Sequence, residues 1–179
     1  LSEAISPCVL WIDEIEKAFV GVGGDSSNEV TTRLFGQFLT WLQEHTTPVF
    51  VIATANSIDK LPVEFLRKGR FDEIFFVDLP TENEREQIFN LQLKRQEKLF
   101  VSLNLDVRKV DTKQYAQKAV NYSGADIEAL VKKLSEDVFV DGIRDINTHI
   151  LNLIDEMQPS CEIMWKKIND MRKKANEMG

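Results

Sequence analysis

Val9-Leu10-Trp11-Ile12-Asp13-Glu14 is the stretch that decides the fold, because four apolar residues run directly into two acids. Two more runs rich in β-branched and aromatic residues follow at 49–54 and 74–77. Such nearly unbroken apolar runs are typical of parallel strands that are covered on both faces. Residues 30–44 place apolar side chains on one helical stripe between the first two runs. Strand, helix and strand in this order predict a right-handed βαβ unit of an α/β sheet.

The pattern changes to helices after Pro80. Thr81-Glu82-Asn83-Glu84 has the form of a capping box and predicts a helix that runs to about Lys98. Further helices are predicted after Thr112, after Ser123, from Asn147 to Pro159, and from about Glu162 to Lys174. We therefore expect an α/β part at residues 1–80 and an all-helical part at 81–179, with a hinge near Pro80.

Composition excludes several classes of protein. The 22 Lys and Arg residues are outnumbered by 29 Asp and Glu, and no dense basic block is present, which disfavours nucleic acid as a partner. No apolar run approaches the ~20 residues of a membrane-spanning helix. Cys8 and Cys161 lack zinc-site spacing, which favours a reducing compartment such as the cytoplasm. Because the chain begins at Leu1, we expect it to be a piece of a longer protein.

Polar side chains follow the first two predicted strands. Asp13 and Glu14 at the carboxyl end of a buried strand have the pattern of a Walker B site, in which Asp13 orients Mg²⁺ through water and Glu14 acts as general base. Asn56 follows the second strand and is placed to hold a phosphate or the attacking water. Each signal alone has an ordinary alternative, since acids cap many strands and Asn is a common turn residue.

Two arginines stand three residues apart in Phe65-Leu66-Arg67-Lys68-Gly69-Arg70-Phe71-Asp72. Arg keeps its charge and presents planar donors that suit phosphate oxygens. The ordinary alternative is a pair of surface arginines in salt bridges.

The run from Val51 to Pro80 resembles the second region of homology of the AAA family of ATPases, with A-T-A-N, the arginine motif and D-L-P in the same order. Tyr122-Ser123-Gly124-Ala125-Asp126-Ile127 is similar to the S-G-A-D-I sequence of that family's helical lid. The flanks of the Walker B acids most resemble AAA proteins of bacteria, cyanobacteria and chloroplast genomes. The resemblance implies a P-loop NTPase core of the AAA+ type, with a parallel sheet truncated in its N-terminal half, followed by an all-helical lid.

The resemblance also implies roles for individual residues. Asn56 becomes sensor 1, and Arg67 and Arg70 become arginine fingers that serve the ATP of a neighbouring subunit in a ring, usually a hexamer. Gly124 and Ala125 pack near the adenine. The cofactors implied are ATP and Mg²⁺, and the implied function is remodelling of a macromolecular partner, in which the substrate is a protein that the sequence does not identify.

The sequence departs from the family in one major respect, because it contains no G-x-x-x-x-G-K-[ST]. We therefore expect the chain alone to be inactive, and the strand that carries the phosphate loop to be missing from the sheet. The 74–77 strand would then be displaced, unpaired or paired with another chain. Residues 21–29 are expected to form a loop, facing the pore or simply exposed. The alternative function is a non-catalytic scaffold that donates arginines in trans, and a DNA-handling AAA+ protein is disfavoured by the negative charge.

Overall fold

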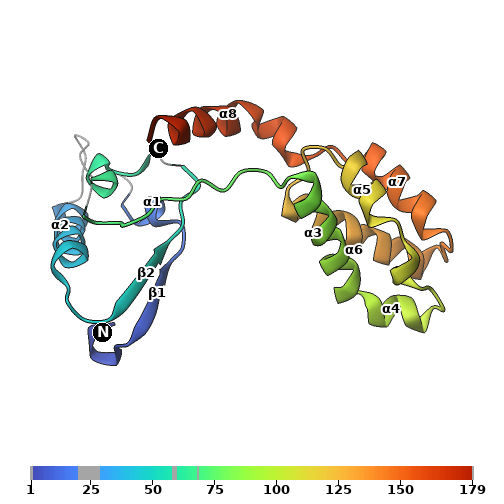
Figure 1. Ribbon diagram of the computed structural model, residues 1–179, viewed down its shortest axis with the longest axis horizontal. Coiled ribbons are helices and arrows are strands. Elements are labelled where there is room, and N and C mark those ends of the chain that lie inside the picture. The colour runs from blue at the N-terminus through green and yellow to red at the C-terminus, as the bar shows by residue number, and fades with distance from the viewer. Residues whose placement is uncertain (1, 20–28, 58–59, 68, 179) are drawn as a thin grey trace. The chain divides into compact units, whose positions relative to one another are not determined.

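The computed structural model describes residues 2–19, 29–57, 60–67 and 69–178 (Figure 1). They form two compact units, one within residues 1–75 and the other within 76–179. The described part is mostly helical and contains one small parallel sheet of two strands. No helix of that part combines the length and the apolar character needed to span a membrane.

The first unit is built on a parallel pair of strands. β1 (Cys8–Ile12) pairs with β2 (Val49–Ala53), in a register that runs from Cys8 opposite Val49 to Ile12 opposite Ala53. The elements that flank or join these strands are η1 (Glu3–Ile5), α1 (Ile15–Ala18), α2 (Glu29–Glu44) and η3 (Val63–Leu66). The predicted β-α-β order is confirmed, and the helix predicted at 30–44 begins one residue earlier.

Aromatic residues dominate the core of this unit. Phe65 is 2% exposed, and its ring lies 5.3 Å from that of Phe35 and 5.5 Å from that of Phe19. The remaining buried members of the cluster are Ile15, Leu39 and Leu42. Ile12 of β1 packs against this cluster, as do Val51 and Ala53 of β2. One face of the sheet is therefore joined to α2 through the core.

The opposite face of the sheet is exposed among the described residues. Val9, Trp11 and Phe50 are 63%, 68% and 68% exposed, and Ile52 is 45% exposed. The expectation that both faces are covered is therefore wrong for the part of the chain that the structure describes. An unbroken apolar run shows that both faces are suited to burial, but it does not show that a second layer is in place.

The prediction of a strand at residues 74–77 is wrong. Residues 73–78 have no regular secondary structure, and Phe75 and Val77 are 81% and 87% exposed. A strand exists only where its N–H and C=O groups meet those of a neighbour, and no described segment supplies one here. The segment is therefore unpaired, as expected for a sheet without its central strand.

The second unit is all-helical. Its helices are α3 (Glu82–Arg95), α4 (Glu97–Ser102), η4 (Val107–Lys109), α5 (Thr112–Lys118), α6 (Gly124–Val140), α7 (Ile146–Glu156) and α8 (Ser160–Met178). The capping box at Thr81 is confirmed, because the Glu84 N–H donates to its hydroxyl at 3.4 Å while the Glu84 carboxylate accepts the Thr81 N–H at 2.7 Å. The first helix ends earlier than predicted, at Arg95, because the backbone turns at Gln96 before α4 begins.

The helices of the second unit enclose their own apolar core. Phe89 of α3 and Tyr115 of α5 are fully buried and meet edge to face, with ring centroids 5.7 Å apart. α6 supplies the stripe of apolar residues predicted from its spacing, and Ile150 of α7 belongs to the same apolar cluster. The fully buried residues of α6 are Ile127, Leu130, Val131 and Leu134. This unit therefore has a core that does not depend on the first.

Polar contacts attach α8 to the rest of its unit near both ends. The Ser160 hydroxyl donates to Asp126 at 2.9 Å, and the guanidinium of Arg172 donates to both carboxylate oxygens of Asp78 at 2.7 and 2.8 Å. The hydrogen bonds from Arg172 lower the pKa of Asp78. α8 is thus linked to the start of α6 and to the segment that precedes α3.

Leu130→Ala is expected to lower the free energy of unfolding of the second unit by about 2–5 kcal/mol, because it empties space at a fully buried site. Urea denaturation followed by far-UV circular dichroism measures this loss. Val140→Ala at the end of the same helix is the matched control, since Val140 is 76% exposed and its truncation should change stability by less than about 0.5 kcal/mol. Equal losses in the two variants would contradict the proposed core.

Stability of the second unit is expected to fall in acid through Asp137. This carboxylate is 7% exposed, and its pKa is lowered mainly by the hydrogen bond from Lys133, with a further contribution from His149. A pKa lowered by folding gives stability that is present above the ordinary value of 3.8 and is lost as the pH falls through the lowered value. Urea midpoints between pH 6 and pH 2 measure the loss.

The acid-dependent loss should shrink in Asp137→Asn, whose side chain does not titrate. Asp170→Asn on the exposed side of α8 provides the control, and it should keep the acid dependence of the parent chain. A parent-like slope in Asp137→Asn would contradict the role of this carboxylate.

Candidate functional site

The carboxyl ends of β1 and β2 meet because the two strands are parallel and end in register. Ile12 lies opposite Ala53, and the ladder continues past both strands. The Thr54 N–H donates to the Ile12 carbonyl at 2.9 Å, and the Ile15 N–H donates to the Thr54 carbonyl at 2.9 Å. This continuation places the predicted acids beside the segment that carries Asn56.

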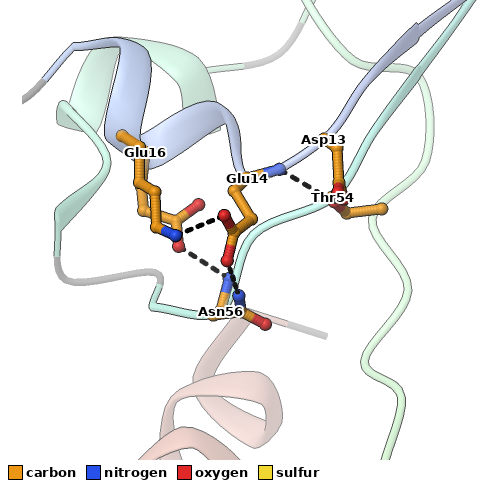
Figure 2. Close-up of polar contacts among 6 residues, drawn as sticks. Asp13, Glu14, Glu16, Thr54 and Asn56 are labelled. Carbon is orange, nitrogen blue, oxygen red and sulfur yellow. Dashed lines mark hydrogen bonds and ion pairs between the residues drawn. The ribbon is translucent and has the colours of Figure 1, made fainter.

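Thr54 joins the two acids through its hydroxyl group. The hydroxyl oxygen accepts the Glu14 N–H at 3.0 Å, and the hydroxyl donates to Oδ1 of Asp13 (Figure 2). Thr54 belongs to the A-T-A-N motif, but no role was predicted for it from the sequence. The signal that could have found it is a hydroxyl at the end of one parallel strand, directly beside the strand that carries the acids.

Glu14 is held in an unusual backbone conformation. Its φ and ψ are 50° and 51°, in the left-handed region that side chains other than glycine rarely occupy. Strain of this kind collects at functional sites when the surrounding contacts enforce it. Here hydrogen bonds from the backbone N–H groups of Glu14 and Ile15 to Thr54 enforce it.

The Glu14 carboxylate faces Asn56. Nδ2 of Asn56 donates to Oε1 of Glu14 at 2.7 Å (Figure 2). The Lys17 ammonium pairs with Oε2 of Glu14. The hydrogen bond between Lys17 and Glu14, together with the negative charge of Glu14, raises the pKa of Lys17. The structure therefore brings together Asp13, Glu14 and Asn56, which the sequence analysis had placed at this edge from three separate signals.

Glu16 is a third acid at this edge, and the sequence patterns did not predict a role for it. Its residue is 3% exposed, and Oε1 accepts the backbone N–H of Asn56 at 3.0 Å. Among the described residues, Oε2 has no hydrogen-bond partner. A charged residue in a short helix usually faces water, so no feature of the local sequence distinguishes Glu16 as buried.

The two predicted arginines lie on either side of a turn in the same unit. Arg67 follows η3 and is exposed, whereas Arg70 is half-buried and donates from Nη1 to the Glu64 carbonyl. Gly69 between them has a φ of 89°, a conformation that favours glycine. Among the described residues, neither arginine forms a hydrogen bond or ion pair with Asp13 or Glu14, so the structure does not bring the predicted fingers into the Asp13–Glu14 cluster.

Gly124 and Ala125 open α6 in the second unit. Ser123 caps this helix, because its hydroxyl accepts the Asp126 N–H at 3.2 Å while the Asp126 carboxylate accepts the Ser123 N–H at 2.8 Å. A Cβ built on Gly124 would lie 4.0 Å from Ile88 Cδ1, which is an ordinary contact. Neither backbone conformation nor crowding within this chain therefore requires glycine at position 124.

Asp13 is the side chain best placed to hold a divalent cation. It is exposed at the sheet edge, and the hydrogen bond from Thr54 engages one of its two oxygens, Oδ1. The described residues contain no group of three His, Cys, Asp or Glu side chains that could enclose a metal. A single carboxylate fits Mg²⁺, which keeps several waters and takes other ligands from phosphates.

The predicted loop at 21–29 lies outside the described residues except for Glu29, and Lys68 lies outside them as well.

Comparison with known proteins identifies the family to which this arrangement of residues belongs. The family model of the "ATPase family associated with various cellular activities (AAA)" matches residues 1–79, which contain all the residues of this cluster. The chain belongs to the AAA family. Its parallel strands and helical second unit fit the P-loop NTPase core and helical part of an AAA protein.

Several proteins are similar to this AAA chain over most of its length. The AAA domain-containing protein ycf46 of Guillardia theta is 42% identical over 95% of the chain and 32% of that protein. The protein of the same name from Pyropia yezoensis is 47% identical over 73% of the chain and 25% of that protein. A cell division cycle protein 48 homolog of Archaeoglobus fulgidus is 34% identical over 72% of the chain and 17% of that protein. The chain thus spans a third or less of the length of these relatives.

Thr54→Val is expected to speed hydrogen exchange at the Glu14 amide roughly fivefold, because losing the hydroxyl acceptor removes about 1 kcal/mol of protection. Amide exchange followed by NMR measures the rate. Thr40→Val is the matched control, since its hydroxyl donates at 3.0 Å to the Gly36 carbonyl within α2. The assignment of the bridge to Thr54 fails if both variants leave exchange at Glu14 unchanged.

Proposed function

We propose that this chain is the part of an AAA-type ATPase that carries the hydrolytic residues, and that the full-length protein uses ATP to remodel a macromolecular partner. The observation that carries the proposal is the 2.7 Å contact between Nδ2 of Asn56 and the Glu14 carboxylate, beside Asp13. A carboxylate base, an amide that orients it and a carboxylate suited to Mg²⁺ then lie at the carboxyl ends of two neighbouring parallel strands. That edge is where open α/β sheets bind ligands.

Each residue of the cluster has a part in this reaction. Glu14 accepts the proton of the attacking water as general base. Asn56 holds the Glu14 carboxylate through Nδ2 and acts as sensor 1. Asp13, kept in place by the Thr54 hydroxyl, would hold Mg²⁺. The magnesium ion supplies neutralisation of phosphate charge when it is bound.

The ion pair with Lys17 is the contact of Glu14 that has to open. In the structure both Glu14 oxygens are engaged, one by Asn56 and one by Lys17. A general base needs one oxygen free for the water. The Lys17 side chain is 67% exposed, and an exposed ion pair contributes little stability, so Lys17 is the partner that yields.

The remaining residues act in an assembly. Arg67 and Arg70 serve as arginine fingers for the ATP of a neighbouring subunit in a ring, usually a hexamer, and Gly124 with Ala125 makes room for the adenine. The exposure of Arg67 supports this assignment, because a finger that acts in trans must be accessible. An arginine finger is worth about 10³–10⁵ in rate in related phosphoryl transfers. We therefore infer that the isolated chain hydrolyses little or no ATP.

The compartment that we propose is the cytoplasm, or the plastid stroma, because the ycf46 relatives come from plastid genomes.

Glu14→Gln in the full-length protein is expected to lower ATP hydrolysis by at least about 10²-fold while ATP binding is retained. The amide keeps an oxygen for Asn56 but cannot take up a proton. Steady-state phosphate release and nucleotide binding by equilibrium dialysis measure the two effects. Glu44→Gln, at the exposed end of α2, is the control and should hydrolyse ATP at the parent rate. Unchanged hydrolysis in Glu14→Gln would overturn the assignment of the base.

A second function, a non-catalytic module that donates arginines in trans, is favoured by the absence of G-x-x-x-x-G-K-[ST] from the sequence. Mixing the chain with a polypeptide that carries this motif and the preceding half of the domain separates the two functions. The ATPase proposal expects activity to return, and to be lost again when the added chain carries Arg67→Ala and Arg70→Ala. A stable but inactive mixture supports the scaffold.

A further inference from the structure

Glu16 is a buried acid that the proposed reaction does not use. It lies two residues after the general base, in the first turn of α1, and it is 3% exposed, whereas Asp13 and Asn56 are exposed. Its neighbour Ile15 is 2% exposed and belongs to the core of the first unit. Glu16 therefore occupies a position where an apolar side chain is ordinarily found.

Two hydrogen bonds join Asn56 to the turn that carries Glu14 and Glu16. The backbone N–H of Asn56 donates to Oε1 of Glu16 at 3.0 Å, and its side-chain Nδ2 donates to Oε1 of Glu14 at 2.7 Å (Figure 2). One bond fixes the backbone of Asn56 and the other fixes its amide. Because the Glu16 carboxylate is shielded from water, its bond is the less screened of the two. The exposed bond to Glu14 depends on a backbone that is already in position.

The second oxygen of Glu16 argues against a purely structural role. Oε2 is buried and has no hydrogen-bond partner among the described residues. A buried polar atom without a partner destabilises a fold, and an apolar side chain of similar size often stabilises it better. Packing alone therefore does not account for a carboxylate at this position, whereas the need for an acceptor facing the Asn56 N–H does.

We propose that Glu16 is a positioning residue, which holds the backbone of Asn56 so that the Asn56 amide meets the Glu14 carboxylate. The catalytic meaning of this role rests on the proposed ATPase function. The positioning role itself is a property of this chain. We call it a relay, because Glu16 holds the Asn56 backbone and the Asn56 side chain in turn holds Glu14. It predicts that removing the Glu16 acceptor loosens the Asn56 side chain, although Glu16 bonds to the Asn56 backbone and the side chain bonds to Glu14.

NMR of the ¹⁵N-labelled chain tests the relay without nucleotide. In Glu16→Met the backbone amide of Asn56 should exchange about 10-fold faster, and its Nδ2 resonances should move toward those of a free Asn side chain. Glu16→Gln keeps an acceptor oxygen and should preserve both signals. The urea midpoint should not fall in Glu16→Met, because an apolar side chain replaces an incompletely paired carboxylate. A merely structural Glu16 gives the opposite result, a lower midpoint with Asn56 resonances unchanged.

Two further variants keep this test decisive. Glu16→Asp retains the charge and withdraws the acceptor by one methylene, so it should loosen Asn56 even if Glu16→Met does not fold. Thr47→Val is the control, because Thr47 Oγ1 is the other buried atom without a partner in the described part of the first unit, and Thr47 precedes the opposite end of β2. Thr47→Val should leave the Asn56 resonances in place. Unchanged Asn56 signals in Glu16→Asp, or the same loss in Glu16→Gln as in Glu16→Met, overturn the proposal.

ATPase kinetics of the full-length protein test the catalytic consequence. Glu16→Met should lower kcat about 10- to 100-fold, the range found when a supporting hydrogen bond is removed from a functional residue. KM for ATP should change less than twofold, and Glu16→Gln should restore most of kcat. A parental kcat in Glu16→Met overturns the positioning role. If the parent full-length protein hydrolyses no ATP, the proposed function fails, and the NMR result still decides whether the relay exists.

Discussion

The parallel pairing of β1 with β2 is the constraint on which the candidate site depends. Ile12 lies opposite Ala53, so both strands end at the same level and the residues that follow are side by side. Thr54 then bonds to both neighbouring turns through its N–H, its carbonyl and its hydroxyl. A slip of one residue in register would turn every strand side chain to the other face and separate these groups. The chemistry at this edge is thus a consequence of register, which the apolar core beneath the sheet fixes.

The second unit depends on a different kind of constraint, the hydrogen bonds that cap its helices at their ends. Asp126 takes part in two of these junctions, because it completes the capping box at Ser123 and accepts the hydroxyl and N–H of Ser160. Hydrogen bonds from Ser123 and Ser160 lower the pKa of Asp126 against the opposing effect of burial. The starts of α6 and α8 are therefore held by one carboxylate, next to the Gly124–Ala125 pair.

Features with a local cause could be predicted from the sequence. The capping box predicted at Thr81 involves residues three apart, and the apolar stripe of α6 follows from helical spacing; the structure confirms both. The acids and Asn56 were also placed correctly, since parallel strands bring their carboxyl ends to one edge. The family resemblance supplied what these patterns alone did not.

Features that depend on distant partners could not be predicted. The 74–77 run has the composition of a strand, but a strand requires a neighbour and the described chain offers none. The exposed sheet face around Trp11 and Phe50 has the same cause, because an apolar pattern does not reveal which layer is present. The burial of Glu16 is decided by the docking of α1 under the Asn56 segment, which local sequence does not encode.

The backbone of Glu14 places the needs of folding and of chemistry in conflict at one residue. A left-handed conformation costs a side chain other than glycine about 1–2 kcal/mol, and glycine adopts it freely. Selection for a stable fold alone would therefore favour glycine at this position and would remove the carboxylate that faces Asn56. An acid can persist here only where its chemistry outweighs that advantage. For the proposed base, the identity of residue 14 in a related chain therefore indicates whether a carboxylate is still required at this edge.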